Sequence, residues 1–102
     1  MELLVVKKDG HKEAFNREKL KSGIVKALEK RPGIEKADNL VGKIEKRFRR
    51  KGRKEVTSKA IGQMVLTELK KLDTVAYLRF ASVYRRFDDP EDFTKELSSL
   101  SN

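Results

Sequence analysis

The stretch "VVKKDGHKEAFNREKL", Val5 to Leu20, decides the fold of the N-terminal part of the chain. It places the pair Asp9-Gly10 between two short segments that we interpret as strands, over 3–8 and 11–15. This pair is typical of a type I′ hairpin turn, in which both central residues have positive φ. Asn16 is a typical N-cap, so the stretch predicts a β-hairpin followed directly by a helix.

The same stretch carries four lysines and one arginine. A two-residue turn would place Lys8 opposite His11 and Lys7 opposite Lys12, and like charges that face each other across a hairpin repel. An anion between the lysines would reverse that penalty, and Lys19 would add a cation at the start of the following helix. The pattern indicates either an anion site or an exposed strand face whose charges are screened by salt.

Five helical segments follow, each with an apolar stripe of helical period. The predicted stripes are Leu20, Ile24, Ala27 and Leu28; Ala37, Leu40, Val41, Ile44 and Phe48; Ile61, Val65, Leu69 and Leu72; Ala76, Phe80, Val83, Tyr84 and Phe87; and Phe93, Leu97 and Leu100. The first helix is predicted to stop at Pro32-Gly33 and the second, over 35–50, at Gly52. Thr57 or Ser58 is the predicted cap of the third helix and Asp73 that of the fourth, and Pro90 is the predicted first residue of the fifth.

These elements predict one α+β domain over 1–102. A hairpin lid at 3–15 would cover a bundle of about four helices at 16–88, and a short C-terminal helix would occupy 89–100. A chain of 102 residues is long enough for a single core without disulfides or metals.

Composition narrows the function classes. The chain has no cysteine and one histidine, which excludes a disulfide framework, a cysteine zinc site and a histidine metal cluster. The apolar run at Leu3 to Val6 is too short for a signal peptide or a membrane span, so we expect a cytoplasmic protein without a membrane partner. A net charge of +9 indicates a polyanionic partner.

Part of that charge lies in "KRFRRKGRK", residues 46–54, where seven of nine positions are basic. One interpretation is a nucleic-acid contact through clustered cations. The other is a solvated helix end, where cations suit the helix dipole and Phe48 completes the core stripe. The candidate contacts are Lys46, Arg47, Arg49, Arg50, Lys51, Arg53 and Lys54.

Catalytic motifs are absent from the sequence. It has no phosphate-binding G-x-x-x-x-G-K-[ST] loop, no G-x-G-x-x-G, no H-E-x-x-H and no G-x-S-x-G. We interpret Asp88-Asp89 as a helix cap before Pro90 rather than as magnesium ligands, and His11 as a surface residue rather than a general base. We therefore expect no enzyme and no metal site.

Taken together, the motifs resemble the ATP-cone domain, the nucleotide-sensing module of many ribonucleotide reductases and of the repressor that controls reductase genes. The opening stretch is similar to the V-x-K-[RK]-D-G and F-[DN]-x-x-K-[IL] signatures of that family. The segments "EKRPG", "VTSKAIGQMVLTEL" and "LDTVAYLRFASVYRRFDDPEDF" extend the likeness over nearly the whole chain. The last of them looks more like the repressor's cone than a reductase's.

The resemblance implies a hairpin or small sheet that closes a nucleotide, ATP or dATP, against a helical bundle. It leaves open whether magnesium accompanies the triphosphate. It also implies switching of a homo-oligomer or of a partner surface, the partner being a reductase or a DNA-binding chain. Carried over by position, it assigns phosphate contacts to Lys7, Lys8 and Lys19, sugar and triphosphate contacts to Glu13 and Asn16, the base pocket to Val5 and Ile61, and further contacts to Thr57 or Ser58, Tyr84 and Arg86.

The sequence departs from both parent architectures, because it has neither the repressor's cysteine zinc ribbon nor the reductase's catalytic barrel. Little sequence precedes the signature, so we expect a free-standing cone protein rather than an excised domain. Two function hypotheses remain. One is a regulatory module that senses ATP and dATP; the other is a nucleic-acid-binding transcription regulator that uses residues 46–54.

Overall fold

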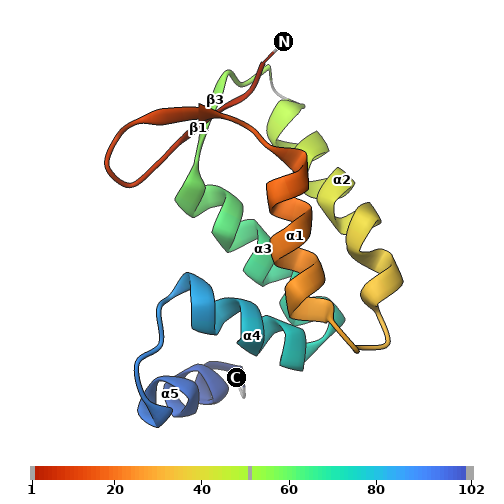
Figure 1. Cartoon of the computed structure of the whole chain (residues 1–102), viewed down its shortest axis with the longest axis vertical. Helices are drawn as coiled ribbons and strands as arrows, with labels where there is room; N and C mark the ends of the chain where they lie inside the picture. Colours follow the sequence, from red (N-terminus) through yellow and green to blue (C-terminus); the bar gives the residue numbers. More distant parts are fainter. Residues whose placement is uncertain (1, 51, 101–102) are drawn as a thin grey trace.

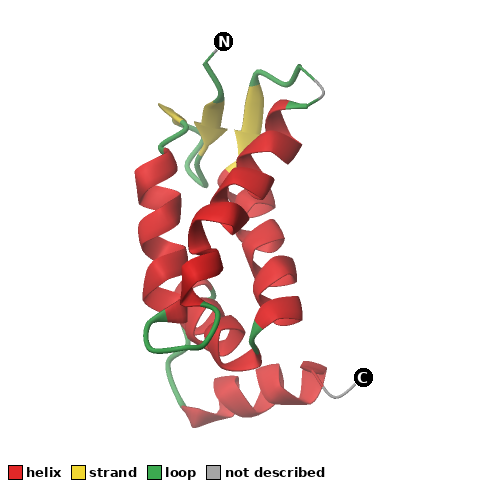
Figure 2. Ribbon diagram, turned by 90° about the vertical axis from the view of Figure 1, so that its right-hand side faces the viewer, coloured by secondary structure: helices red, strands yellow, loops and turns green. Residues whose placement is uncertain are grey.

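The computed structural model describes residues 2–50 and 52–100, and it confirms the α+β class. The strands are β1 (Leu4–Val6), β2 (Lys12–Ala14) and β3 (Glu55–Thr57). The helices are α1 (Arg17–Leu28), α2 (Ala37–Arg49), α3 (Ser58–Leu72), α4 (Thr74–Tyr84) and α5 (Pro90–Leu100), with a short 3-10 helix, η1 (Ile34–Lys36), before α2. The strands gather at one end of the helices and α5 lies at the other (Figure 1, Figure 2).

The lid is a three-stranded sheet rather than a hairpin alone. Its strand order is β2-β1-β3, with β1 antiparallel to β2 and parallel to β3. Strand β3 was not predicted, because a three-residue segment that ends on a helix cap gives no local signal. Val56 of β3 is paired with Val5 and is buried, whereas its neighbours Glu55 and Thr57 are exposed. Pairing with β1 therefore makes this segment a strand, and it interrupts the range that we predicted as purely helical.

The predicted two-residue turn is wrong. Val6 pairs with Lys12, and the Lys7 amide donates to the His11 carbonyl at 2.9 Å, so the loop holds three residues, 8–10. Gly10 has a φ of +91°, whereas Asp9 is not among the described residues with positive φ. A three-residue loop with glycine at its left-handed position is the next most common hairpin connection. It replaces the type I′ turn that the Asp-Gly pair suggested.

This shift of one residue changes which side chains face each other. Neighbouring residues of a strand point to opposite faces of a sheet, so a register change by one moves every side chain to the other face. Lys7 lies opposite His11, and Lys12 points away from it and donates to Glu55 of β3, with Nζ and Oε2 2.6 Å apart. The predicted repulsion between Lys7 and Lys12 therefore does not occur.

The predicted helix starts are confirmed by side-chain caps. Asn16 Oδ1 accepts from the Lys19 amide at 3.1 Å, and Asp73 Oδ1 accepts from the amides of α4. Thr57, not Ser58, caps α3, because its Oγ1 accepts from the Ala60 amide at 3.0 Å. These caps satisfy amides that have no partner inside the helix.

The first two helix boundaries differ from the prediction. α1 ends at Leu28, ahead of Pro32-Gly33, because Lys30 takes a left-handed φ of +61° and the Arg31 amide donates back to the Leu28 carbonyl. α2 begins at Ala37 because the preceding turn is the tighter η1. Gly52 follows α2 with a φ of +65°, as a residue that ends a helix often does.

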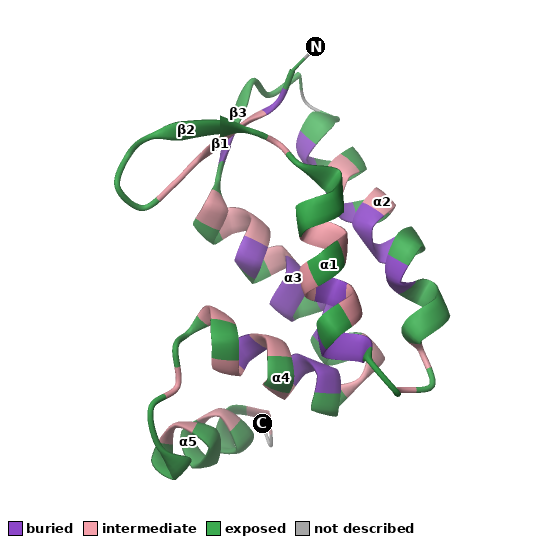
Figure 3. Cartoon of the chain, in the orientation of Figure 1, coloured by how far each residue is buried: buried purple, intermediate pink, exposed green. Residues whose placement is uncertain are grey.

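The core lies between α1, α2, α3 and α4, under the sheet (Figure 3). Its largest fully buried side chains are Leu3, Ile24, Leu28, Ile44, Leu69, Val41 and Val65, which confirms most of the first three stripes. The predicted face of α4 is partly wrong: α4 buries Ala76, Tyr77 and Ala81, whereas Val83 is 79% exposed. Packing against α1 and α3 selects this face, and it overrides the apolar pattern of the sequence.

The fifth helix is confirmed, but it buries none of its residues. It is attached to α4 by Glu96, whose two carboxylate oxygens accept from Tyr77 Oη at 2.5 Å and from Arg85 Nε at 3.2 Å. Phe93 also meets Phe87 edge to face, with ring centroids 4.8 Å apart. No described helix, α5 included, has the length and apolarity needed to cross a membrane.

Candidate functional site

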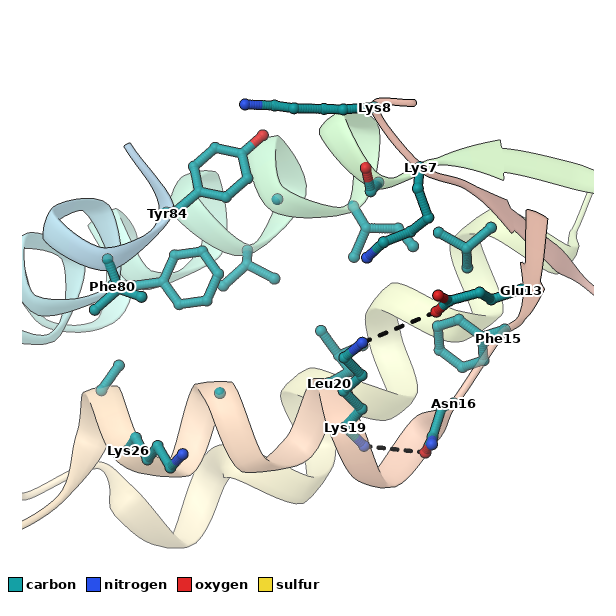
Figure 4. A pocket seen from close by; sticks show the side chains of 18 of the residues that line it. Lys7, Lys8, Glu13, Phe15, Asn16, Lys19, Leu20, Lys26, Phe80 and Tyr84 are labelled. Carbon is teal, nitrogen blue, oxygen red and sulfur yellow. Dashed lines mark hydrogen bonds and ion pairs between the residues drawn. The ribbon is translucent and has the colours of Figure 1, made fainter. Parts of the chain in front are cut away.

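A cavity of about 1290 Å³ opens between the sheet, one side of α1, the start of α3 and the end of α4 (Figure 4). Val5 enters its wall from β1, Lys7 from the position after β1, and Glu13 from β2. The first turn of α1 contributes Lys19, three residues after the Asn16 cap, so the positive end of the helix dipole lies on this wall. The hairpin therefore forms the roof of the cavity and the helices form its floor.

The cavity wall has an excess of positive charge. Its basic side chains are Lys7, Lys8, Lys19, Lys26, Lys30, Arg79 and Arg86, and its acidic ones are Asp9, Glu13 and Glu29. Lys7 and Lys19 extend toward each other across the space below the roof (Figure 4). An excess of one sign of charge in a cleft concentrates the electrostatic field, so this cavity attracts polyanions.

Glu13, a carboxylate on the roof, contacts two basic side chains nearby. Glu13 Oε1 lies 3.9 Å from Lys19 Nζ, and Glu13 Oε2 lies 2.7 Å from His11 Nε2. The hydrogen bond from His11 is the main cause that lowers the pKa of Glu13. The same bond, followed by the one to Asp9, raises the pKa of His11 above its ordinary value of 6.5.

Aromatic rings from α4 form the wall opposite the roof. Phe80 and Tyr84 are stacked with ring centroids 5.9 Å apart, and both are half-buried. Tyr84 lies against Gly62 of α3, where a Cβ atom would come within 2.2 Å of the ring, so only glycine leaves room for it there. The Tyr84 hydroxyl donates to the Lys59 carbonyl at 3.2 Å. This wall presents a flat apolar surface of the kind on which a nucleic-acid base stacks.

Comparison with known proteins assigns this architecture to a family. Residues 3–90 match the ATP cone domain, and they include the sheet, the helices α1 to α4 and every side chain of the cavity. The chain belongs to the ATP-cone family. It is therefore a regulatory, nucleotide-sensing module, as the resemblance of its motifs implied.

The cone is also similar to curated bacterial proteins. The "Transcriptional repressor NrdR" of Limosilactobacillus fermentum is 50% identical over 99 residues, which cover 96% of this chain and 65% of the repressor. The proteins of the same name from Desulfitobacterium hafniense and Acetivibrio thermocellus are 56% and 52% identical and are covered over 64% and 67% of their lengths. The chain thus spans just under two thirds of the first two of these relatives.

The structure brings nearly all of the predicted site residues together. Val5, Lys7, Lys8, Glu13, Asn16, Lys19, Ser58, Ile61, Tyr84 and Arg86 all line the cavity of the cone. Thr57 does not line it, because its hydroxyl caps α3. Arg86 has a left-handed φ of +54° at the end of α4, and this conformation belongs to the turn that leads to α5.

Sequence reasoning missed the far end of the cavity. Lys26 and Lys30 of the α1 end line it together with Arg79 of α4, whose guanidinium donates to the carbonyls of Ala27 and Glu29 at 3.2 and 2.7 Å. Lys19 and Lys26 are seven residues apart and so share a face of α1, which was a usable signal. No signal pointed to Arg79, because only tertiary packing places α4 beside α1.

The basic run of the cone lies apart from the cavity. Its described basic residues, Lys46, Arg47, Arg49, Arg50, Arg53 and Lys54, are exposed and do not line the cavity; Lys51 lies outside the described residues. Phe48 is 9% exposed, which confirms its predicted place in the core. Arg49 donates to Glu45 and lies over the Phe15 ring, 5.7 Å from its centroid.

Carboxylates elsewhere have structural roles. Asp89 Oδ1 accepts from the Glu91 amide at 3.0 Å, which confirms the predicted cap of α5. Over residues 2–50 and 52–100, no group of three or more histidine, aspartate or glutamate side chains is arranged to hold a metal ion.

Proposed function

We propose that the cone binds ATP or dATP in the cavity between the sheet and the helices, and that the bound nucleotide changes its association with itself or with a partner. The observation that carries this proposal is the wide cavity with its excess of lysine and arginine. Its volume of about 1290 Å³ exceeds the range of about 300 to 1,000 Å³ that is usual for small-molecule pockets. A nucleoside triphosphate therefore has enough room.

The phosphates belong under the roof in this proposal. Lys7, Lys8 and Lys19 supply ammonium groups there, and the start of α1 adds the positive end of its dipole. Arg86 offers a planar guanidinium from the end of α4, and such a group suits a phosphate because it donates two parallel hydrogen bonds. Mg²⁺ often binds through substrate phosphates, so any magnesium would enter with the triphosphate.

The base and the sugar occupy the less charged walls in this proposal. Val5 and Ile61 are half-buried apolar residues at the cavity, and the Phe80–Tyr84 pair offers a stacking surface. Glu13, Asn16 and Ser58 supply the oxygen acceptors and the hydroxyl that a ribose or deoxyribose would meet. A pocket that distinguishes ATP from dATP must contact the sugar, since the two nucleotides differ only in the 2′-hydroxyl.

The biological role follows from the relatives. They are named transcriptional repressors, and we propose that this cone reads the balance of ATP and dATP for the control of ribonucleotide reductase genes. In this role it performs no chemistry on the nucleotide. Its output is a change in oligomeric state or in the surface shown to a reductase or to a DNA-binding chain.

Isothermal titration with ATP, dATP and GTP at one salt concentration tests the proposal. We expect saturable binding of both adenine nucleotides and weaker binding of GTP, because the chain belongs to the ATP-cone family. Absence of binding for all three would refute the proposal. Equal binding of all three would preserve the triphosphate site and refute selectivity for adenine.

A second candidate function rests on the exposure of the basic run, whose described lysines and arginines are all exposed. Such a surface would contact a nucleic-acid backbone. DNA binding of this kind weakens steeply as salt rises, because each phosphate contact releases counterions. Binding of a DNA duplex that is lost on Arg47→Ala with Arg50→Ala, while ATP binding persists, would assign the run to this second function.

A further inference from the structure

His11 lies on the roof of the cavity, and the proposed nucleotide contacts do not include it. Its Nδ1 lies 2.5 Å from Asp9 Oδ1, and its Nε2 lies 2.7 Å from Glu13 Oε2. An ionised carboxylate only accepts hydrogen bonds, and a neutral imidazole has an N–H on only one of its nitrogens. Only the protonated imidazolium donates to two ionised carboxylates at once, so this geometry favours a cationic His11.

The surroundings connect His11 to the proposed phosphate site. Lys7, the residue after β1, lies opposite it, and Lys19 of α1 approaches the second oxygen of Glu13 at 3.9 Å. Glu13 is thus shared between a histidine on one side and a cavity lysine on the other. The raised pKa of His11 and the lowered pKa of Glu13 agree with this arrangement.

We infer that His11 is a positioning residue that competes with Lys19 for Glu13, and so makes nucleotide affinity fall as pH rises. While His11 is protonated, it neutralises Glu13 and leaves Lys7 and Lys19 to a polyphosphate. Once the proton is lost, Glu13 loses its hydrogen bond to the imidazolium. Its charge then competes with the phosphates for the same two lysines. This inference rests on the proposed function.

The sign and size of the effect follow from the same contacts. Both carboxylates raise the pKa of His11 above 6.5, so the proton is lost on the alkaline side of that value. Asp9, His11 and Glu13 are about half exposed or more, and solvent therefore screens their interactions. One exposed ion pair corresponds to a change in affinity of about two- to fivefold.

Titrations of ATP between about pH 6 and about pH 8.5 test the inference in three proteins, the wild type, His11→Gln and His11→Arg. The wild type should lose affinity by about two- to fivefold over this range beyond any change seen in the variants. His11→Gln should bind weakly throughout, because a neutral amide releases Glu13. His11→Arg should bind tightly throughout, because its charge does not titrate. Comparison at each pH cancels the titration of the ATP phosphates themselves.

A second measurement works without nucleotide. The ring resonances of His11 should titrate above 6.5 in the wild type and closer to 6.5 in Glu13→Gln. Titration below 6.5 in the wild type would overturn the inference. A common pH dependence of ATP affinity in all three proteins would also overturn it, with the proposed function intact. Failure of every protein to bind ATP at any pH would refute the proposed function and this inference together.

Discussion

At the scale of single residues, the cavity shows how one side chain gains a role from the residue beside it. Lys7 points into the cavity because the three-residue loop places it opposite His11, on the same face as Val5 and Glu13. Lys12 is also a lysine, five positions along the chain, but its side chain lies on the opposite face of the sheet and pairs with Glu55. Residue type and sequence position are therefore not enough to identify a phosphate contact.

The prediction at this scale concerns the two lysines under the roof. Lys7→Ala and Lys19→Ala should each weaken ATP binding on the order of tenfold, because each removes a charged hydrogen-bond donor. Their melting temperatures should change little, since both side chains are exposed or half-exposed. Lys70→Ala is the matched control, because Lys70 is an exposed lysine of α3 that does not line the cavity. Unchanged calorimetric titrations for both variants would remove these lysines from the site.

At the scale of elements, Asp73 connects two helices that are distant in the sequence. One of its carboxylate oxygens caps α4, and the other accepts from Arg31 Nε at 2.7 Å in the loop after α1. Its side chain is only 8% exposed. The start of α4 is thereby attached to the end of α1, and the wall formed by Phe80 and Tyr84 depends on that position.

Replacing Asp73 should therefore destabilise the fold. Asp73→Ala should lower the free energy of unfolding by about 2 kcal/mol, because it removes both the cap and a charged hydrogen bond. Asp73→Asn retains an acceptor for the cap and should cost less. Urea denaturation measures both values, and Asp38→Asn, in an exposed pair with Lys21, is a control that should change stability little.

The pH dependence of this effect has a definite sign. The hydrogen bond from Arg31 is the main cause that holds the pKa of Asp73 below its ordinary value of 3.8. A depressed pKa adds stability that is present above 3.8 and is lost as pH falls through the folded-state value. The stability gap between wild type and Asp73→Asn should therefore be full near neutral pH and should close in acid. A gap of constant size would contradict the assignment.

At the scale of the whole molecule, charge opposes association of the free cone. The net charge of +9 makes two copies repel, and the cavity holds many of the cations. A bound triphosphate cancels part of this charge. The sheet lies at one end of the molecule, while α5, with Phe93 and Leu97 partly exposed, lies at the other. Nucleotide binding thus has a physical route to a change in oligomeric state.

The prediction at this scale is that ATP and dATP give different association states. Sedimentation velocity of the nucleotide-free, ATP-saturated and dATP-saturated cone should yield distinct profiles at the same salt concentration. Lys19→Ala provides the control, since it should require more nucleotide to reach the same states. Identical profiles for all three samples of the wild-type cone would contradict switching, although they would leave nucleotide binding standing.

Several features of the site were predictable because contiguous motifs carry them. Lys7, Lys8 and Glu13 lie in one short stretch with Lys19, and this stretch folds into a hairpin and a helix start through local bonds. Lys26, Lys30 and Arg79 were missed. They reach the same cavity only because α4 packs beside α1, with Arg79 bonded to carbonyls at the end of α1.

The sequence by itself determined the helices, their caps and the bulk of the core, because a helix is built from contacts within a few residues and its caps and stripes can be read locally. Tertiary structure alone decided strand β3 and the buried face of α4. β3 pairs Leu4 with Glu55, and no local pattern records a partner so distant in the chain. The cavity is likewise a product of packing, since its walls come from segments at both ends of the sequence.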